Sequence, residues 1–366
     1  MMTNIELQSK TIRWLRFPLA VAIVFIHQSD LEAVKEHLLH INCQYLSHID
    51  DFICLFVSDL LLRVATPLFS VFSGFLFFYK VKEWNLKIYF EKIKRKMKTL
   101  VVPYMLWNII PIIVTAVFLL IKFDGSLSIF MNQLWENNIL NIFWNYHSND
   151  AGSLGYPYNI PMWFVRDLIV VTFLAPIVYY YIKRIKLVGV IILGVCFYTE
   201  IPFPILSIKA FFFFSLGAYF SIHGKNMIVE MRKGSMIWLL ITVIAMILSM
   251  YYQTSSMYNY FRSLYIIFGS ITLINIGSYL IEHGHIHASD HSFLSKTSFF
   301  IFSAHNVFLL GLSKRLISII IKSESTFFMI IKYFITPIVC VCICLGLYYI
   351  ASKITPKLLK ILTGSR

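Results

Sequence analysis

Apolar segments of helical length recur along all 366 residues of the chain, and short polar or basic segments separate them. A hydrocarbon layer about 30 Å thick needs about 20 helical residues to cross it, and helices that face the inside of a bundle can be partly polar. The pattern predicts ten transmembrane helices, at residues 12–30, 53–79, 100–121, 162–182, 186–199, 205–222, 235–252, 258–280, 297–314 and 326–350. We therefore expect an all-α, polytopic membrane protein.

The composition supports a membrane protein built as one unit. Hydrophobic residues make up 58% of the chain and charged residues 14%, whereas soluble domains have about 45–50% and about 25%. No stretch outside the predicted helices is long enough to form another core. The short apolar run near the N-terminus ends in His-Gln-Ser-Asp rather than in a cleavage site, so we expect a retained first helix. The expected organisation is a single transmembrane domain over residues 1–366, with no appended soluble domain.

The net charge of +14 is distributed in a way that indicates membrane topology. Eight Lys and Arg residues fall between Lys80 and Lys98, and smaller clusters follow at 183–186, 225–233 and 353–360. The alternate loops carry few basic residues, as expected when basic loops stay in the cytoplasm. We expect both termini to be cytoplasmic and the loop 122–161 to lie outside, in a multi-pass protein of the cell (inner) membrane. Membrane lipids are expected partners, and nucleic acid is not.

The cysteines and the clustered histidines do not define a metal or disulfide site. The six cysteines show no C-x-x-C spacing. A polar segment holds His283, His285, His287 and His291. Metal binding there is one interpretation, but the i,i+2 spacing favours a solvated loop. We therefore predict no metal site.

The first predicted helix carries the clearest candidate for chemistry. Arg16 and His27 are eleven residues apart in an apolar segment, and eleven steps of about 100° end about 20° past three full turns, about 16 Å along the axis. The two side chains therefore share one face, and Asp30 is spaced to orient the imidazole of His27. The alternative is that Arg16 snorkels at a helix end and His27 lies near the far interface. Ionisable side chains that face a bundle interior favour a site.

The second helix contains an acid–base pair and helix-weakening residues. Asp59 and Arg63 are spaced i,i+4 with the acid first, which favours an ion pair. Pro67 and Ser73-Gly74 follow, and we expect them to break or loosen the helix. A cavity lined by broken backbone and a simple proline kink both remain open.

Further cations and aromatic residues lie near predicted helix ends. Arg95 and Lys98 belong to a dense basic patch before the third helix, which is suited to lipid head groups or the phosphates of a nucleotide-bearing donor, or serves topology alone. Trp163 and Arg166 start the fourth helix near the outer interface, and His305 lies in an apolar segment where a structural role is the common one. Aromatic residues of the outer loop, Trp144 among them, either anchor it in the interface or stack on sugar rings.

Several of these stretches, taken in order, resemble the acyltransferase-3 family of integral membrane acyltransferases. The resemblance is carried by Arg16-x10-His27, "RVATPLFSVFSGFLF", Arg95-x-x-Lys98 before "PYMLW", "MWFVRDL", "FFFFSLGAYF" and "FSAHNVF". It extends from about residue 10 to 350. The family implies a ten-helix fold that takes an acyl group from acyl-CoA at the cytoplasmic side and delivers it to a glycan hydroxyl at the outer side.

The resemblance also implies roles for individual residues. His27 corresponds to the catalytic histidine and Arg16 to its motif partner, while Arg95 and Lys98 take the place of a donor-binding Arg-x-x-Arg. Lysine in the second position keeps the charge but loses the planar fork of arginine. Acetyl-CoA or another acyl-CoA is then a co-substrate, with no permanently bound cofactor, and a surface or lipid-linked glycan is the acceptor.

The chemistry of the candidate residues fits acyl transfer but leaves alternatives open. Histidine suits the removal of a hydroxyl proton, and Arg63 or Arg166 would stabilise an oxyanion. General-base catalysis and a covalent acyl-histidine are not distinguished, nor are acetyl and longer acyl groups. A polysaccharide exporter or other transporter would also place Arg and His inside the membrane. The number of ionisable residues disfavours a purely structural subunit.

Overall fold

The computed structural model describes residues 2–28, 49–81, 83–122, 125–136, 138–147, 155–201, 207–286 and 293–365, and these residues are almost all helical. The N-terminal half forms α1 (Asn4–Ile26), α3 (Ile49–Cys54), η1 (Leu55–Leu60), η2 (Leu61–Val64), α4 (Ala65–Phe78), α5 (Leu86–Lys96), η3 (Met97–Val101), α6 (Val102–Lys122), α7 (Ser126–Glu136), η4 (Ile139–Phe143), η5 (Ile160–Met162) and α8 (Trp163–Phe173). The C-terminal half forms α9 (Ala175–Tyr198), α10 (Ile208–Ile222), α11 (Met227–Arg232), α12 (Ser235–Tyr251), α13 (Met257–Glu282), α14 (Phe293–Ala304), η6 (His305–Leu309), α15 (Leu310–Ile320), α16 (Thr326–Ile354) and α17 (Pro356–Leu362). No strand occurs in these residues, which agrees with the predicted all-α class.

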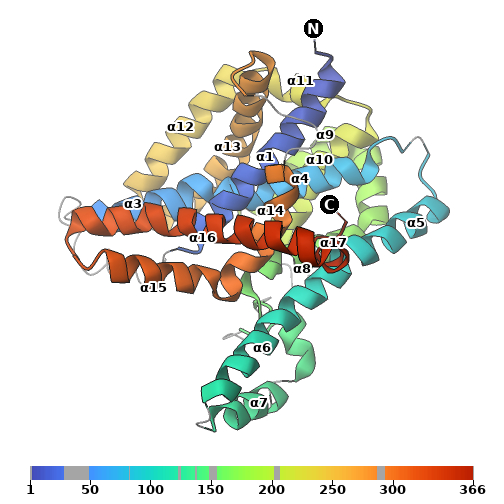
Figure 1. Cartoon of the computed structure of the whole chain (residues 1–366). Helices are drawn as coiled ribbons and strands as arrows, with labels where there is room; N and C mark the ends of the chain where they lie inside the picture. Colours follow the sequence, from blue (N-terminus) through green and yellow to red (C-terminus); the bar gives the residue numbers. More distant parts are fainter. Residues whose placement is uncertain are drawn as a thin grey trace.

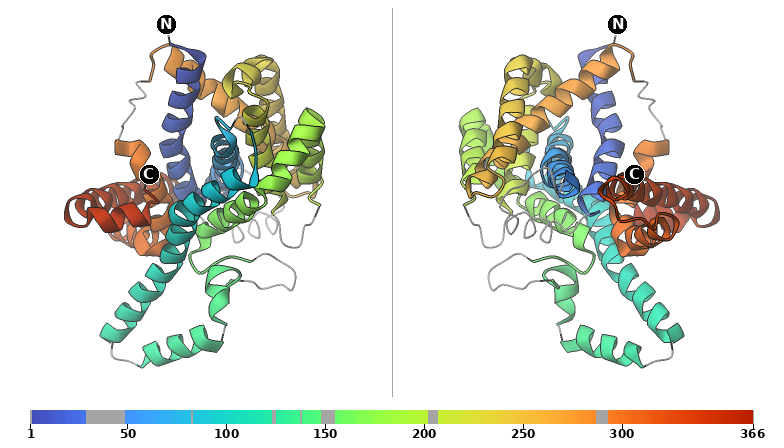
Figure 2. Two further views of the ribbon diagram at one scale, coloured as in Figure 1. Left: turned by 90° about the vertical axis from the view of Figure 1, so that its right-hand side faces the viewer. Right: turned by 90° about the vertical axis from the view of Figure 1, so that its left-hand side faces the viewer.

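The helices pack mainly in pairs, of which α4 with α10 is the most extensive. The most extensive pairings are α4 with α10, α12 with α13, α9 with α10, α1 with α14 and α15 with α16. Figures 1 and 2 show that α6 and α7 extend away from the other helices, on the side opposite the N-terminus. The helix α7 lies within the segment 122–161, which we predicted to connect two spans on the outer side, and that side stays a prediction.

Five of the described helical segments are long and apolar enough to cross a membrane, or six if a bent pair counts as one span. They are Ile49–Phe78, Leu86–Lys122, Met257–Glu282, Phe293–Ile320 and Thr326–Ile354, with Ile160–Phe173 and Ala175–Tyr198 as the bent pair. A multi-pass membrane protein is therefore supported. The predicted ten spans are not confirmed, and the sides on which the termini lie remain a prediction.

The helix predicted at residues 162–182 is broken in the structure, although we predicted no break within it. The helices α8 and α9 meet at Leu174 with a bend of 66°, and Pro176 stands in the first turn of α9, where a missing N–H costs nothing. The turn expected at 183–186 appears as a non-helical residue, Lys186, with φ 57° inside α9. Proline in the first turn of a helix was thus the available signal for the break.

The first helix begins eight residues before its predicted start. Thr3 and Glu6 form a capping box in which the Thr3 side chain accepts from the Glu6 backbone N–H and the Glu6 carboxylate accepts from that of Thr3. The helix ends at Ile26, so His27 is its C-terminal cap. Residues 29 and 30 of the predicted helix lie outside the described residues.

The second predicted helix is irregular before Pro67, not after it. A π-helical turn, η1, and a 3-10 turn, η2, precede α4, which then runs without interruption to Phe78. The expected break at Pro67 and Ser73-Gly74 is wrong. Pro67 is the third residue of α4, where no intrahelical donor is needed, and Gly74 serves helix packing instead.

Two glycines allow α4 and α10 to touch backbone to backbone. A Cβ atom on Gly74 would lie 1.9 Å from the carbonyl oxygen of Phe214, and one on Gly217 would lie 1.9 Å from that of Val71. Both glycines are helical, so it is the close approach and not the backbone conformation that requires them. This contact fixes α10 against the helix that follows Arg63.

Candidate active site

Two histidines, the half-buried His27 and the buried His305, face each other where α1 ends. The ring centroids of His27 and His305 are 5.4 Å apart, with the ring planes tilted by 40°. His305 is 0% exposed and opens the π-helical turn η6. His27 also lies within electrostatic range of Arg63 and Lys314. Although 278 residues separate them in sequence, the two imidazoles form one pair.

The tautomer of neutral His305 follows from its hydrogen bond. Its Nδ1 lies 3.1 Å from the carbonyl oxygen of Ile301. A carbonyl only accepts, so Nδ1 carries the proton and Nε2 keeps a lone pair. Among the described residues, the buried Nε2 has no hydrogen-bond partner. His305 therefore offers a proton-accepting nitrogen beside the ring of His27.

A short hydrogen-bond chain holds the end of α1 in place. The Ser58 hydroxyl donates to the carbonyl oxygen of Phe25 at 2.8 Å, and its oxygen lies 2.7 Å from the Tyr333 hydroxyl. Because the Ser58 proton is directed at the carbonyl, Tyr333 is the donor in the second bond. These bonds connect η1 and α16 to the helix end that carries His27.

Asp59, next to Ser58, is the centre of a buried ion cluster. It is 0% exposed, and its Oδ1 accepts from Arg63 at 2.8 Å and from Arg262 at 3.1 Å. Its Oδ2 accepts from the Tyr258 hydroxyl at 2.7 Å. The predicted Asp59–Arg63 pair is thus present. Arg262 of α13 was not foreseen, although a lone arginine in an apolar helix is the same signal that drew attention to Arg63.

Arg166 and Asp167 form a second buried ion pair at the start of α8, with N–O distances of 3.0 Å. Arg166 also donates to the carbonyl oxygens of Trp144 at 2.7 Å and Gly155 at 3.0 Å, and its guanidinium lies 5.2 Å from the centre of the Trp144 ring. Trp144 therefore packs on a buried cation. Near this pair, Lys209 of α10 lies over the ring of Trp163, at 5.9 Å.

Asn159 links three segments beneath the ion pairs. Its side-chain amide donates to the carbonyl oxygens of Trp107 and Ser303 at 2.9 and 3.0 Å, and its backbone N–H donates to Asn108. Ser303 is two residues before His305 on α14. Asn159 thus connects the segment before α8 to α14, the helix that leads into His305. No spacing or motif in the sequence singles out this asparagine.

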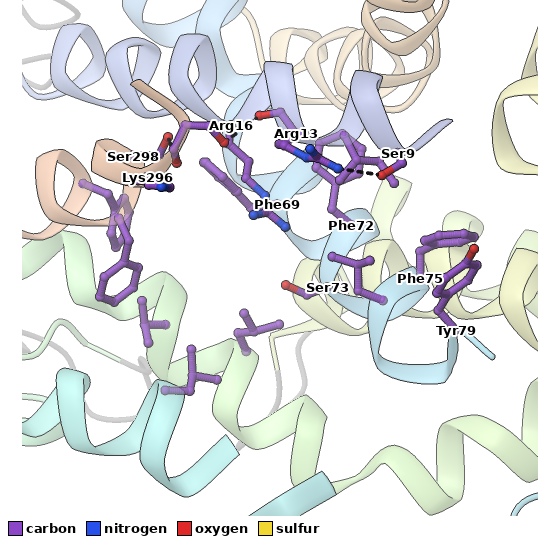
Figure 3. Close-up of a pocket in the computed structure, with 18 of the residues that line it drawn as sticks. Ser9, Arg13, Arg16, Phe69, Phe72, Ser73, Phe75, Tyr79, Lys296 and Ser298 are labelled. Carbon is purple, nitrogen blue, oxygen red and sulfur yellow. Dashed lines mark hydrogen bonds between the residues drawn. The ribbon is translucent and has the colours of Figure 1, made fainter. Parts of the chain in front are cut away.

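A pocket of about 480 Å³ lies along the N-terminal part of α1. Basic side chains line it from three segments, namely Arg13 and Arg16 of α1, Lys96 of α5 and Lys296 of α14. Hydroxyl groups line it as well, from Ser9, Ser73, Ser295 and Ser298. Figure 3 shows Arg16 reaching from α1 toward Phe69, with Arg13 bonded to Ser9 further along the helix. No carboxylate is among the described residues that line this pocket.

Three phenylalanine rings close the end of the pocket that is nearer to the histidines. Phe69 and Phe164 have ring centroids 6.2 Å apart, and Phe164 and Phe302 are 6.0 Å apart. Phe302 precedes His305 by three residues, so about one helical turn separates this floor from the histidine pair. We call the rings of Phe69, Phe164 and Phe302 the phenylalanine floor.

Comparison with known proteins identifies the family of this chain. A family model described as an acyltransferase domain matches residues 10–349. The chain belongs to the acyltransferase-3 family. It is also similar to the succinoglycan biosynthesis protein ExoH of Rhizobium meliloti, with 24% identity over 333 residues, which is 86% of this chain and 83% of that protein. No solved structure matches.

Within this acyltransferase-3 chain, Arg16 and His27 face successive parts of the same two stretches of chain, one around α4 and one around α14. Arg16 lines the pocket between α1, α4 and α14, whereas His27 meets His305 after α14 and lies near Arg63 before α4. The shared face deduced from the eleven-residue spacing is therefore present. Asp30, the third predicted catalytic residue, lies outside the described residues.

The two basic residues predicted to bind the donor do not line the pocket. Arg95 and Lys98 are exposed and do not line the pocket, whereas Lys96, between them, does. Lys98 lies in the π-helical turn η3, which changes the helical phase after α5. Donor binding by Arg95 and Lys98 stays a prediction that this geometry does not favour.

The histidine-rich segment has no site within its described part. The rings of His283 and His285 lie 6.4 Å apart, and that of His283 lies 4.0 Å from Tyr279. His287 and His291 lie outside the described residues. No group of three or more His, Cys, Asp or Glu side chains able to hold a metal occurs in the described ranges of the chain.

Proposed function

We propose that the protein is an O-acyltransferase of the cell (inner) membrane that moves an acyl group, acetyl in the simplest case, from acyl-CoA to a glycan hydroxyl. The observation that carries the proposal is one helix, α1, with a cation-lined pocket beside Arg16 and the pair of His27 and the buried His305 at its end. Membership of the acyltransferase-3 family supports acyl transfer. The name of the similar succinoglycan biosynthesis protein supports a surface or lipid-linked glycan as acceptor.

The pocket suits the phosphate-bearing end of acyl-CoA. Arg13, Arg16, Lys96 and Lys296 supply charge, and serine hydroxyls supply further donors. Phosphate oxygens accept charge-assisted hydrogen bonds from such groups. The excess of basic residues in nearby loops supports a cytoplasmic position, which is where acyl-CoA is found.

The histidine pair suits the transfer step itself. As the acceptor oxygen attacks the thioester carbonyl, an imidazole nitrogen of His27 takes the hydroxyl proton. The C–S bond then breaks, and the departing thiolate of coenzyme A receives that proton, so the imidazole is neutral again. His305 Nε2, the lone-pair nitrogen beside His27, is placed to support this proton transfer. A covalent acyl-His27 intermediate remains the alternative to direct transfer.

Charge that develops on the carbonyl oxygen needs a cation nearby. Arg63 is within electrostatic range of His27 and is held by Asp59 at 2.8 Å, so its position is fixed before the substrate arrives. A positioned donor of this kind typically contributes about 3 kcal/mol to transition-state stabilisation. Arg166, held by Asp167, supports the acceptor side together with Trp163.

The phenylalanine floor stands between donor pocket and histidines. An acyl group bound by the pocket has to pass Phe69, Phe164 and Phe302 to reach His27. An apolar passage admits a short acyl chain while keeping bulk water away from the thioester. This arrangement favours transfer to a sugar hydroxyl over hydrolysis.

The test is replacement of His27 by alanine in cells that make the glycan. We expect the acyl content of surface glycans, measured by mass spectrometry, to fall by about 10²- to 10⁴-fold, the usual contribution of a general base. Membrane insertion should be unchanged, and His283→Ala, a histidine outside the pair, should leave acylation intact. Full acylation with His27→Ala would overturn the assignment. Loss of the surface glycan itself, with the acyl content of the remainder unchanged, would indicate export instead.

A further inference from the structure

We propose that Arg63, Arg262 and Lys209 form a binding site for an anionic group of the substrate, a carboxylate or a phosphate, beside the histidine pair. This inference deepens the proposed function and rests on it. The site lies at the ion cluster of Asp59, beyond the phenylalanine floor, and is distinct from the cation-lined pocket along α1.

Among the described residues, the ion cluster and the neighbouring Arg166–Asp167 pair together contain more cations than carboxylates. The cations are Arg63, Arg166, Lys209 and Arg262, and the carboxylates are Asp59 and Asp167. Four positive and two negative charges leave an excess of two. Charges that are removed from water are costly unless a partner neutralises them. A bound anion would lower this cost.

The two carboxylates are already engaged. Both arginines share Oδ1 of Asp59, and Tyr258 occupies Oδ2. Asp167 is bonded to Arg166. Lys209 lies within electrostatic range of Asp59, Asp167 and the two arginines bonded to Asp59. It forms no salt bridge with a described residue. Its ammonium group therefore remains available to a ligand.

The arginines also retain hydrogen-bonding capacity. The buried Nε of Arg63 has no partner among the described residues. The side chains of Arg63 and Arg262 are 25% and 22% exposed, so a small ligand can reach them although Asp59 beneath them is fully buried. Guanidinium groups bind carboxylates and phosphates through parallel N–H donors. Carboxylate and phosphate are thus the ligand chemistries that this cluster suits.

The position of the cluster gives the anion a function. Arg63 is within electrostatic range of His27, and Ser58, next to Asp59, is bonded to the helix end that carries His27. A substrate held by its anionic group at the cluster would present a nearby atom to the histidines. The anion would then select which hydroxyl, or which acyl group, reacts.

Two parts of the substrate could carry this anionic group. It could belong to the acceptor glycan, as a uronate or a sugar phosphate, or to the acyl group, as the free carboxylate of a dicarboxylic acid. The experiment has one arm for each source. Methyl glucuronide and glucose 1-phosphate probe the first, with methyl glucoside as the neutral match. The N-acetylcysteamine thioester of malonate probes the second, with the acetyl thioester as its match.

The measurement is ligand-induced thermal stabilisation of the full chain in lipid nanodiscs, with each probe at millimolar concentration. We expect at least one anionic probe to stabilise the wild type and its neutral match to have no effect. In Arg262→Gln and in Lys209→Met, the dissociation constant should rise at least about tenfold. Arg262→Lys, which keeps the charge but loses the fork, should be intermediate.

Two controls separate this site from other cations. Arg16→Gln, in the donor pocket, should keep the stabilisation by the anionic probe, and so should Arg184→Gln, an exposed cation of α9. Absence of stabilisation by every anionic probe, or its persistence in Arg262→Gln and Lys209→Met, would overturn the proposal. Because binding is measured without turnover, it fails separately from the proposed function, whose failure appears as unchanged glycan acylation in His27→Ala.

Discussion

The cation-lined pocket along α1 and the ion cluster beside His27 both contain several cations, but they hold them differently. In the pocket, Arg16 and Lys296 line an opening that no described carboxylate shares. In the cluster, Arg63 and Arg262 are both fixed on Asp59, which is fully buried. The pocket therefore has its charge ready for a ligand, whereas the cluster uses much of its charge to hold its own geometry.

This difference indicates which part binds and which part reacts. Cations on long side chains around an open pocket can adapt to the phosphates of a donor and contribute mainly to affinity. Cations fixed in advance by a buried carboxylate contribute mainly where charge develops during reaction. We therefore expect pocket variants to change KM for acyl-CoA, and variants of Asp59 and His305 to change stability or kcat.

The largest effect is expected when the ion cluster loses its carboxylate. In Asp59→Asn, Arg63 and Arg262 would share a neutral oxygen, and the free energy of unfolding should fall by about 3–5 kcal/mol, as when a buried pair loses one partner. Thermal unfolding in detergent would measure this. Glu324→Gln, at an exposed carboxylate, is the control and should have no effect. Equal melting temperatures for the two variants would show that the cluster is not held by Asp59.

The next effect concerns the second histidine. His305→Gln removes the lone-pair nitrogen beside His27, and kcat should fall by about 10²-fold with little change in KM. Steady-state acyl transfer in proteoliposomes gives both constants. His223→Gln, a half-buried histidine bonded to the carbonyl of Ile182, should change neither. A rise in KM at unchanged kcat would instead place His305 in substrate binding.

The smallest effect distinguishes the pocket from the donor motif expected from the sequence. Lys96→Gln should raise KM for acetyl-CoA about fivefold, corresponding to about 1 kcal/mol, because Lys96 lines the pocket. Arg95→Gln and Lys98→Gln should change KM less than twofold, since exposed charges contribute little. The reverse order of effects would restore the predicted donor-binding pair.

What could be predicted from sequence was mostly local. The Asp59–Arg63 pair follows from a four-residue spacing within one segment, and the common face of Arg16 and His27 follows from helical geometry. Regular helices such as α12 and α13 ended within two residues of their predicted limits. Such features depend only on residues close together in the chain.

What could not be predicted depends on irregular turns or on distant segments. The turns η1, η3 and η6 shift the helical phase, which a regular helical period does not predict. Arg95 and Lys96 are neighbours in α5, and only the packing of distant segments decides that Lys96 lines the pocket. His27 and His305 come from separate helices, and a single sequence carries no signal that two such distant residues are in contact. Arg262 could be recognised as an arginine within a predicted helix, but its ion pair with Asp59 of another helix could not.

The close approach of α4 and α10 at Gly74 and Gly217 has a mechanical consequence. Because backbone meets backbone there, α4 and α10 cannot slide past one another without a clash of main-chain atoms. Phe69 is carried by α4 and Lys209 by α10, so both sit on a single rigid unit. If an acyl chain is to pass the floor, Phe69 can move only by rotation of its side chain, whereas Phe164 on α8 and Phe302 on α14 can also move with their helices. A shift of α14 would carry His305 with it, because His305 directly follows α14 in the chain.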